Sequence, residues 1–407
     1  MAANPSIQLG TDGNWAIKED NLLAYKKDGD RFFNKEFDFS RGSTATYVGR
    51  DGLIASAASG VPRIDFTNDT KGHLLLEPQR TNLITYSEDF SVSDWRKIGD
   101  SSVSVSSEES PDGSYATILS GATSETRNAD VLQWNTGDIL NTSTKYTFSV
   151  FVKSSTSTNV TLGLFDASTG ANNKQDFTVN TNWQRVYLTA TTGSATTFFN
   201  AYIGGTDSDI EIWGAQLEEG SYVTSYIPTT DATSTRNADL CNNSGSAQDF
   251  NDSEGVLFAE IAALANDGTG RKITLNNGSN SNVLVLEYTS TSNQIRVFLS
   301  NGVLQFNEYI TLSDLRLNTK FAIKYKVNDF ALWVNGFELA SDNIGTTFSD
   351  GTLSKINFDD GSGFADFYGK TKAVAVFKEA LTDAELEALT SYTSFTDMAN
   401  ELNLTIK

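Results

Sequence analysis

The amino-acid sequence predicts an all-β protein made of two antiparallel sandwiches in series. They follow a small irregular β-containing N-terminal region and precede a short helix near the C-terminus. Ser, Thr, Asn and Gly are abundant, aromatic residues make up 11% of the 407 residues, and there are only five prolines. Stretches in which apolar and polar residues alternate recur along the chain, and turn-forming residues separate them at intervals of roughly ten residues. Such a sequence is typical of many short strands joined by tight turns.

The chain divides into four predicted parts. These are an N-terminal region (1–80), a first sandwich (81–230), a linker rich in Thr, Ser, Asn and Asp (231–252) and a second sandwich (253–407). The N-terminal region contains too many aromatics for a disordered arm and too little apolar sequence for a core of its own. We therefore expect it to pack on copies of itself or on a larger assembly.

Individual elements follow from local patterns. Residues 145–153 have apolar side chains at every second position (146, 148, 150 and 152), which predicts a strand, and 209–217 closes the first sandwich. Asp51-Gly52 lies between apolar runs and predicts a hairpin. After Phe377, Thr382 and Glu385 have the spacing of a capping box, which predicts the start of the C-terminal helix.

Composition excludes several classes of function. The net charge of −21 and the isoelectric point near 4.4 argue against nucleic acid as a partner and against an anionic membrane surface. Cys241 is the single cysteine, so no internal disulfide forms. The sequence shows neither a signal peptide nor an apolar run long enough to insert into a membrane.

No arrangement of residues predicts catalysis. His73 is the only histidine, and it lies in a turn that enters an apolar strand, so we expect a structural role. Asp209 and Glu211 share a strand face but form a lone pair, whereas glycanases of the β-sandwich type need carboxylates that face each other across a bond. We therefore expect no enzymatic activity.

The candidate glycan-binding residues are aromatics and acids, because sugar rings stack on exposed aromatic faces while polar side chains bond the hydroxyls. Trp95 and Trp134 are the two tryptophans that are candidates for partial exposure, although for any single tryptophan burial in the core is favoured over a ligand contact by roughly three to one. The full candidate set is Trp95, Trp134, Tyr288, Asp359 and Asp360.

The candidate metal ligands are Asp359, Asp360 and Asp366, and Ca²⁺ is the candidate cofactor because it prefers carboxylate oxygens. Asp359 and Asp360 also precede Gly361-Ser362-Gly363, which predicts a turn.

The second sandwich resembles the laminin-G-like, concanavalin-A-like jelly roll. The residues that carry this resemblance are 330–336 (FALWVNG) and 373–386 (AVAVFKEALTDAEL). Residues 180–186 resemble the start of a strand in carbohydrate-binding-module-like jelly rolls. The resemblances imply two jelly-roll sandwiches, the last or both of which bind glycans.

Four further segments resemble tailed-phage and prophage structural proteins. They are 37–48 (FDFSRGSTATYV), 61–66 (VPRIDF), 75–83 (LLEPQRTNL) and 213–220 (WGAQLEEG). Arg41, Arg63 and Arg80 recur within such motifs, and we interpret them as structural groups that pair carboxylates or carbonyls.

The resemblance to phage proteins implies a tail-fibre, head-fibre or spike subunit, assembled in the host cytoplasm and carried on the virion surface. Its partners would be other virion proteins, held through the N-terminal region, and host cell-surface polysaccharide. Such fibres are usually homotrimers, in which weak sites gain from multivalency. One alternative is a purely structural head or tail decoration protein. A second and less favoured alternative is a polysaccharide depolymerase.

Overall fold

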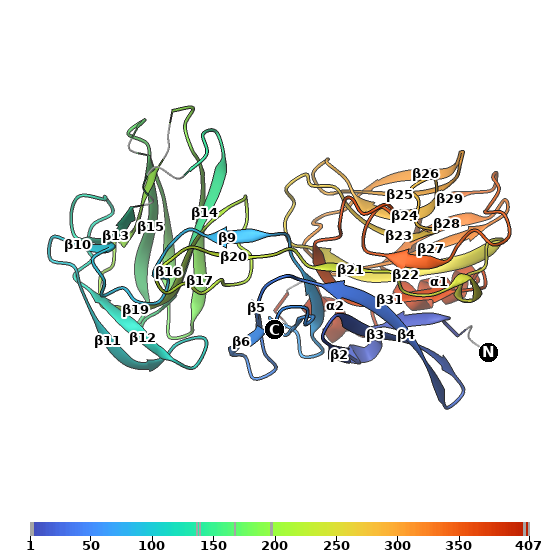
Figure 1. The fold of residues 1–407 in the computed structure, drawn as a ribbon, viewed down its shortest axis with the longest axis horizontal. Coiled ribbons are helices and arrows are strands. Elements are labelled where there is room, and N and C mark those ends of the chain that lie inside the picture. Colours follow the sequence, from blue (N-terminus) through green and yellow to red (C-terminus); the bar gives the residue numbers. More distant parts are fainter. Residues whose placement is uncertain are drawn as a thin grey trace. The chain divides into compact units, whose positions relative to one another are not determined.

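The computed structural model describes residues 4–401 and 404–405, apart from 136, 138, 139, 167, 196 and 197. It divides into two compact units. Unit 1 consists of Met1–Gly42, Ala57–Pro78 and Ala238–Lys407, and unit 2 consists of Ser43–Ser56 and Gln79–Asn237. Strands dominate both units, which confirms the predicted all-β class (Figure 1).

Unit 2 is, in its described residues, a sandwich of two antiparallel sheets. The first, called the β15 sheet, has the order β10 (Trp95–Ile98), β13 (Val131–Asn135), β18 (Phe199–Gly204), β15 (Thr158–Asp166) and β16 (Asn172–Val179). The second, the β14 sheet, has the order β11 (Ser102–Glu109), β12 (Tyr115–Ser120), β19 (Ile210–Glu219), β14 (Lys145–Lys153) and β17 (Gln184–Thr191).

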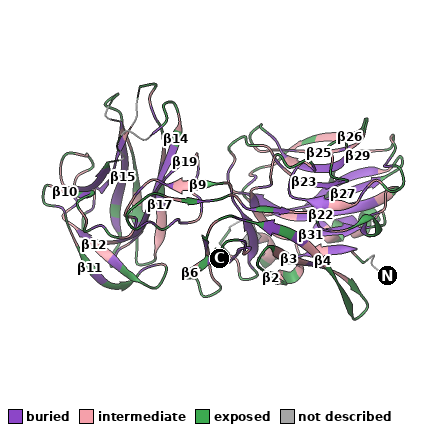
Figure 2. Cartoon of the chain, viewed as in Figure 1, coloured by how far each residue is buried: buried purple, intermediate pink, exposed green. Residues whose placement is uncertain are grey.

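The core of unit 2 lies where the alternating apolar residues of both sheets meet. Phe148 and Val150 of β14 pack with Leu162 and Leu164 of β15 in one buried cluster. Figure 2 shows the strands of the sandwich largely buried and the connecting loops exposed. The predicted strand 145–153 coincides with β14, so alternation alone located this element.

Smaller strand pairs complete unit 2. Strands β5 (Ala45–Val48) and β6 (Ile54–Ala57) form the hairpin predicted from Asp51-Gly52, and Gly52 adopts a φ of 84°, which glycine tolerates best. Strands β9 (Arg80–Asn82) and β20 (Ser234–Arg236) pair antiparallel. Arg80 Nε lies 3.8 Å from Glu218 Oε2, as expected for an arginine that pairs a carboxylate.

Unit 1 contains a large antiparallel sheet, called the β22 sheet. Its main order is β21 (Leu240–Asn242), β4 (Arg31–Ser40), β3 (Asn21–Asp28), β1 (Ile7–Leu9), β31 (Gly369–Phe377), β22 (Glu254–Ala263), β27 (Thr319–Lys326), β28 (Phe330–Val334) and β29 (Phe337–Asp342). Strands β2 (Ile17–Lys18), β7 (Ile64–Asp65) and β8 (His73–Leu76) pair at its side. The N-terminal strands thus join a sheet whose other half comes from residues after 254.

A second sheet of unit 1, the β25 sheet, packs on the first. Its order is β26 (Leu304–Thr311), β25 (Gln294–Asn301), β24 (Asn282–Tyr288), β23 (Arg271–Asn276) and β30 (Lys355–Asn357). The shared core contains Ile7, Leu22 and Phe37 from the N-terminal strands together with Leu257 and Leu284. The sequence placed residues 1–80 in a region of their own, whereas here 1–42 and 57–78 bury their apolar side chains in the core formed with residues 238–407.

Short helices α1 (Asp383–Thr390) and α2 (Phe395–Glu401) follow β31. The predicted capping box is confirmed, because Thr382 accepts a hydrogen bond from the Glu385 backbone while Glu385 accepts one from the Thr382 backbone. Leu386 of α1 is buried with Trp333 against the β22 sheet. Among the described residues, no helix combines the length and apolar character needed to cross a membrane.

Candidate functional site

The outward face of the β15 sheet carries a row of amide side chains around one aromatic ring. Alternate residues of β13, β15 and β18 enter the core, so their neighbours face outward. Strand register places Asn135, Asn200, Phe165 and Asn172 beside one another across β13, β18, β15 and β16. We call these four residues the amide row. Asn135 and Asn172 are exposed and Phe165 is half-buried.

Gln133 lies next to the amide row and has an unsatisfied acceptor. Its Nε2 donates to Asn200 Oδ1 at 3.1 Å, and the two residues are only 1% and 2% exposed. No donor among the described residues reaches Gln133 Oε1. A buried carbonyl oxygen without a partner is costly, so this oxygen is a natural acceptor for a ligand hydroxyl or a water molecule.

Tyr202 lies flat on the same face because Gly163 leaves room for its ring. A Cβ atom built at Gly163 would lie 1.9 Å from Tyr202 Cζ. The Tyr202 hydroxyl bonds the Glu125 carbonyl oxygen at 2.9 Å and Asn172 Oδ1 at 2.8 Å, and burial raises the pKa of this phenol. Tyr202 thereby fixes the position of Asn172 at the edge of the amide row.

Arg127 covers the aromatic member of the row. Its guanidinium carbon lies 3.8 Å from the Phe165 ring centroid, and both side chains are half-buried. A stacked guanidinium of this kind holds its planar donors at a fixed height above the ring. Arg127 therefore adds a cationic donor to one end of an otherwise uncharged site.

The chemistry of the amide row suits hydroxyl groups. A carboxamide donates and accepts at adjacent atoms, which matches the paired donor and acceptor character of neighbouring sugar hydroxyls. The four members of the row carry no titratable group, so binding there should depend little on pH.

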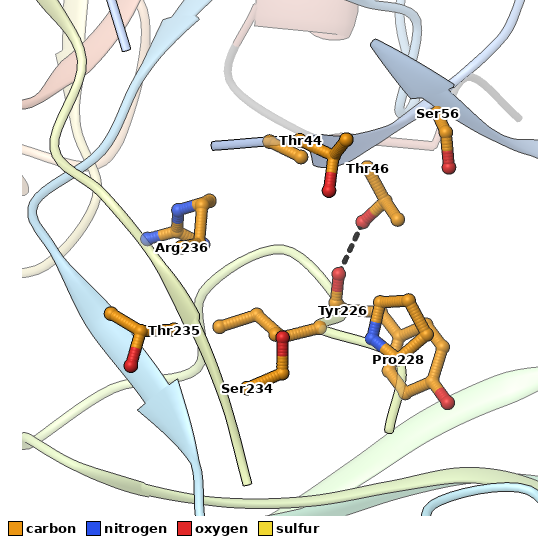
Figure 3. A pocket seen from close by; sticks show the side chains of 10 residues that line it. Thr44, Thr46, Ser56, Tyr226, Pro228, Ser234, Thr235 and Arg236 are labelled. Carbon is orange, nitrogen blue, oxygen red and sulfur yellow. Dashed lines mark hydrogen bonds between the residues drawn. The ribbon is translucent and has the colours of Figure 1, made fainter. Parts of the chain in front are cut away.

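A separate hollow of unit 2, about 350 Å³ including the solvent at its mouth, is lined partly by hydroxyl groups (Figure 3). Thr46 Oγ1 donates to the Tyr226 carbonyl oxygen across this hollow. Arg236 lines another side and donates to Thr224 Oγ1 at 3.2 Å and Ser225 Oγ at 2.9 Å. Thr46 and Arg236 thus already bond within the unit.

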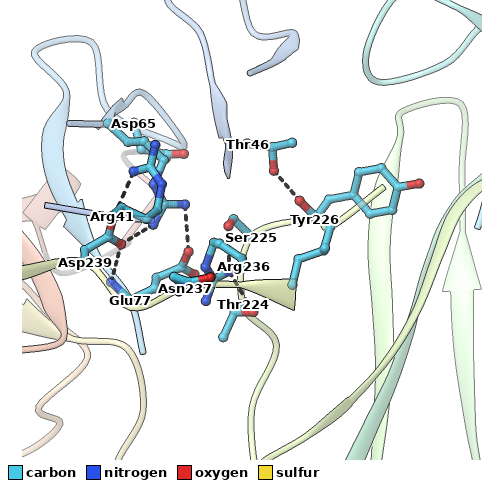
Figure 4. A network of polar contacts seen from close by, with 12 residues as sticks. Arg41, Thr46, Asp65, Glu77, Thr224, Ser225, Tyr226, Arg236, Asn237 and Asp239 are labelled. Atoms are coloured by element: carbon cyan, nitrogen blue, oxygen red, sulfur yellow. Dashed lines mark hydrogen bonds and ion pairs between the residues drawn. The ribbon is translucent and has the colours of Figure 1, made fainter. Parts of the chain in front are cut away.

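Arg41, Arg63, Glu77 and Asp239 form a buried ion-pair cluster within unit 1 (Figure 4). Arg41 Nη1 lies 2.9 Å from Asp239 Oδ1, Arg63 Nη1 lies 2.8 Å from Glu77 Oε2, and Arg63 Nη2 also pairs with Asp239. The four side chains are at most 3% exposed. The prediction that these arginines pair carboxylates is confirmed.

Trp95 and Trp134, two of the predicted glycan-binding residues, are cross-strand neighbours on the core side of the β15 sheet. They are 0% and 4% exposed, and Trp95 Nε1 donates to the Tyr86 carbonyl oxygen at 2.8 Å. The rings are therefore in the core, the placement favoured for any single tryptophan, and the candidate partial exposure is wrong. Their ring faces contact the core and not solvent.

Tyr288 is 2% exposed in the core of unit 1, where its ring centroid lies 5.8 Å from that of Phe367. Burial raises the pKa of the Tyr288 phenol. Its ring is thus shielded from solvent as well. Contact of any of the five predicted residues with a glycan stays a prediction.

The three candidate metal ligands are used by local turns. Asp359 Oδ1 accepts from the Gly361 backbone at 2.6 Å, and Asp360 Oδ1 accepts from the Ser362 backbone at 2.8 Å, which confirms the predicted turn. Asp366 Oδ2 accepts from the Tyr368 hydroxyl at 3.1 Å.

The pKa values of these three carboxyls shift in different directions. Burial and the neighbouring carboxyls raise the pKa of Asp359 and of Asp366. Burial also acts to raise the pKa of Asp360, but hydrogen bonds from Ser362 outweigh it and lower the pKa. Across the part of the chain that the structure describes, no three His, Cys, Asp or Glu side chains form a group that could hold a metal ion, so Asp359, Asp360 and Asp366 do not form a site for the candidate Ca²⁺.

His73 has the structural role expected from the sequence. It is 3% exposed, and its Nε2 lies 3.6 Å from Asp65 Oδ1. Burial and the nearby Lys370 lower the pKa of His73 to about 4, so the ring is neutral at pH 7.

Sequence reasoning missed Gln133, Asn200 and Tyr202. The signal was present in β13, where apolar Leu132 and Trp134 alternate with polar Gln133 and Asn135. That strand is only five residues long, so the alternation spans too few residues to predict which side chains face outward.

Residues 82–209 match the family model described as "Carbohydrate binding domain". The match covers less than a third of the chain and includes every strand of the β15 sheet. Among curated proteins, no relative matches this chain.

Solved structures with similarity to this chain include three glycan-related modules. The carbohydrate-binding module CBM40 of the Ruminococcus gnavus IT-sialidase is 17% identical, covering 37% of this chain and 94% of that chain, with a TM-score of 0.31. Domain 4 of the Geobacillus stearothermophilus arabinanase AbnA is 10% identical, covering 42% and 83%, with a TM-score of 0.33. The xylan-binding CBM22-1 of Paenibacillus barcinonensis Xyn10C is 15% identical, covering 35% and 96%, with a TM-score of 0.28. At these values the likenesses do not bear on what this chain binds.

Proposed function

We propose that this protein binds glycans through the amide row of unit 2. The observation that carries the proposal is the match of residues 82–209 to a carbohydrate-binding domain. All members of the amide row, and Gln133, fall within the matched residues, whereas the residues lining the hollow of Figure 3 lie outside them. The match therefore favours the β15 face over the hollow.

The amide row binds its ligand through hydroxyl groups. Asn135 and Asn172 are exposed at opposite ends of the row, so they bond hydroxyls at the rim. Arg127 covers one face of the Phe165 ring, so the edge of this ring supplies the apolar contact for a sugar. A site built from amides and one aromatic ring supports binding, and we assign no catalytic step to it.

The test is calorimetric titration of the full chain with oligosaccharides chosen from a glycan array. The double variant Asn135→Ala/Phe165→Ala should bind at least about tenfold more weakly, because it loses a rim hydrogen bond and the aromatic contact. Asn182→Ala is the matched control, since Asn182 is exposed in the same unit but lies before β17, in the other sheet. Equal weakening in the control, or unchanged affinity in the double variant, would contradict the proposed site.

We further propose that the protein is a phage virion fibre or spike subunit, trimeric and displayed on the particle surface. The support is the resemblance of residues 37–48, 61–66, 75–83 and 213–220 to virion proteins, with the N-terminal region binding other virion proteins and the sandwiches binding host polysaccharide. Mass spectrometry of purified particles and light scattering of the isolated protein test this role. Absence of the protein from particles would contradict this role.

Two other outcomes would favour the alternatives. A particle in which neighbours cover both sandwiches would favour a decoration protein, and release of reducing ends from host polysaccharide would establish a depolymerase.

A further inference from the structure

The outward face of the β25 sheet in unit 1 carries a second group of ligand-type side chains. Ile295, Val297 and Leu299 of β25 enter the core, so Arg296 and Phe298 face outward. Strand register places Tyr309 of β26 directly opposite Arg296. Tyr309 is 51% exposed, so this ring offers a face to solvent, unlike the aromatics buried in the cores.

Arg296 lies close to two aromatic rings. Its guanidinium carbon lies 4.2 Å from the Phe298 ring centroid and 5.2 Å from the Tyr309 ring centroid. Its Nε donates to Asn307 Oδ1 at 2.7 Å, which fixes the plane of the guanidinium. The orientation of its planar donors is thus set before any ligand arrives, which lowers the entropy lost on binding.

The charge of Arg296 is unmatched. The chain has 51 acidic and 30 basic residues, yet no described carboxylate lies within ion-pair distance of Arg296. The nearest acidic neighbour by register, Glu287, pairs instead with Lys272, at 3.8 Å between Oε1 and Nζ. Hydrogen bonds from the two terminal nitrogens of Arg296 to described residues are absent as well. Two parallel N–H groups therefore remain available on a half-buried cation.

We propose that this face of unit 1 binds a hexuronate sugar of an acidic glycan. The carboxylate takes the two free N–H groups of Arg296 in the fork-to-fork geometry that guanidinium and carboxylate share. The pyranose ring stacks on the exposed face of Tyr309, and Asn307, whose Oδ1 is occupied by Arg296, donates from Nδ2 to a sugar hydroxyl. A neutral sugar has no carboxylate to replace water on both guanidinium donors. The site therefore binds uronates more tightly than neutral sugars.

This site extends the proposed glycan binding to the second unit and is independent of the amide row. The two sites differ in chemistry, since the amide row pairs neutral hydroxyls and the Arg296 site pairs a charge. If one of the two sites proves not to bind glycans, binding at the other site can still be tested by itself.

The test is calorimetric titration of the full chain with trigalacturonate and with a hyaluronan tetrasaccharide. Trigalacturonate methyl ester serves as the uncharged counterpart. Arg296→Gln should weaken binding of the acids at least about tenfold, and Arg296→Lys, which keeps the charge without the fork, at least about threefold. Tyr309→Ala should weaken it by a similar factor through loss of the stacking face. Arg316→Gln is the matched control, because Arg316 is an exposed arginine of the same unit, paired with Asp314.

The expected pattern is binding of at least one acid by the wild type and by the Arg316→Gln and Asn135→Ala/Phe165→Ala variants. The methyl ester should bind at least about tenfold more weakly than the acid. The proposal is overturned if neither acid binds, if the ester binds as well as the acid, or if Arg316→Gln weakens binding as much as Arg296→Gln. The last result would mean that only overall charge matters. Circular dichroism of each variant verifies that the sandwiches remain folded.

Discussion

Substitution of Asp239 by asparagine should strongly destabilise unit 1. Asp239 bonds both buried guanidinium groups, Arg41 and Arg63, and its Oδ2 also accepts the Glu77 backbone N–H at 2.8 Å. The two arginines and two carboxylates of the cluster balance in charge. Asparagine is nearly isosteric with aspartate but removes one negative charge, so one buried positive charge is left uncompensated.

The magnitude follows from the burial of the cluster. Asp239 and both arginine side chains are 0% exposed, so water cannot solvate the leftover charge. Removing one partner of a buried ion pair typically costs about 3–5 kcal/mol. With a urea dependence of about 3 kcal/mol per molar, the unfolding midpoint of unit 1 should fall by roughly 1–2 M.

The assay is hydrogen–deuterium exchange mass spectrometry along a urea series, because it follows each unit separately. Peptides from β22 and β31 should lose protection at lower urea, while peptides from β14 and β15 of unit 2 keep the wild-type midpoint. Asp314→Asn is the control: it breaks the exposed pair with Arg316, which should cost less than about 1 kcal/mol. If Asp239→Asn lowers the unfolding midpoint of unit 1 no more than Asp314→Asn does, the buried ion-pair cluster does not stabilise unit 1.

The remaining predictions concern single side chains. The pKa of His73 is lowered to about 4 from the ordinary 6.5, so the unfolded chain binds a proton that the folded unit excludes. The free energy of unfolding should therefore fall as the pH drops from 6.5 towards 4. In the His73→Gln variant this fall should be smaller by up to about 3 kcal/mol, as measured by urea titrations at successive pH values. A pH profile unchanged in the variant would contradict this. Gly163→Ala should cost about 1–3 kcal/mol in thermal unfolding, since its Cβ displaces the Tyr202 ring, and an unchanged midpoint would argue against the flat ring. Thr382→Ala should cost about 1 kcal/mol and increase exchange at the first turn of α1; equal exchange would show that the cap contributes nothing.

Much of the fold could be predicted from local patterns. Apolar residues at every second position located β14, and a similar pattern located β19. The Asp51-Gly52 turn located the β5–β6 hairpin, and Thr382 with Glu385 located the start of α1. The joining of the N-terminal strands to the β22 sheet could not be predicted in this way. Pairing of Ile7 with Val376 depends on partners far apart in sequence, and period-two alternation specifies a strand without specifying its neighbour.

The candidate sites were harder to predict, because exposure depends on which face of a strand turns outward. Trp134 and Gln133 are adjacent and point to opposite sides of the sheet, so an error of one position exchanges a core residue for one of the outward face. Arg296 gave no sequence signal, since its lack of an acidic partner is a property of the assembled sheet.

The joining of the N-terminal strands to β31 also determines when unit 1 can fold. Ser6 Oγ donates to the Val376 carbonyl oxygen across 370 residues of sequence. At a synthesis rate of about 5–20 residues per second, β1, β3 and β4 wait roughly 20–70 s for the strand that completes their sheet. The unit 2 sandwich, whose residues end at Asn237, is complete on the ribosome well before that. During the interval the N-terminal strands have an unpaired edge and uncovered aromatic side chains, so a growing chain is most prone to aggregation between the folding of the two units.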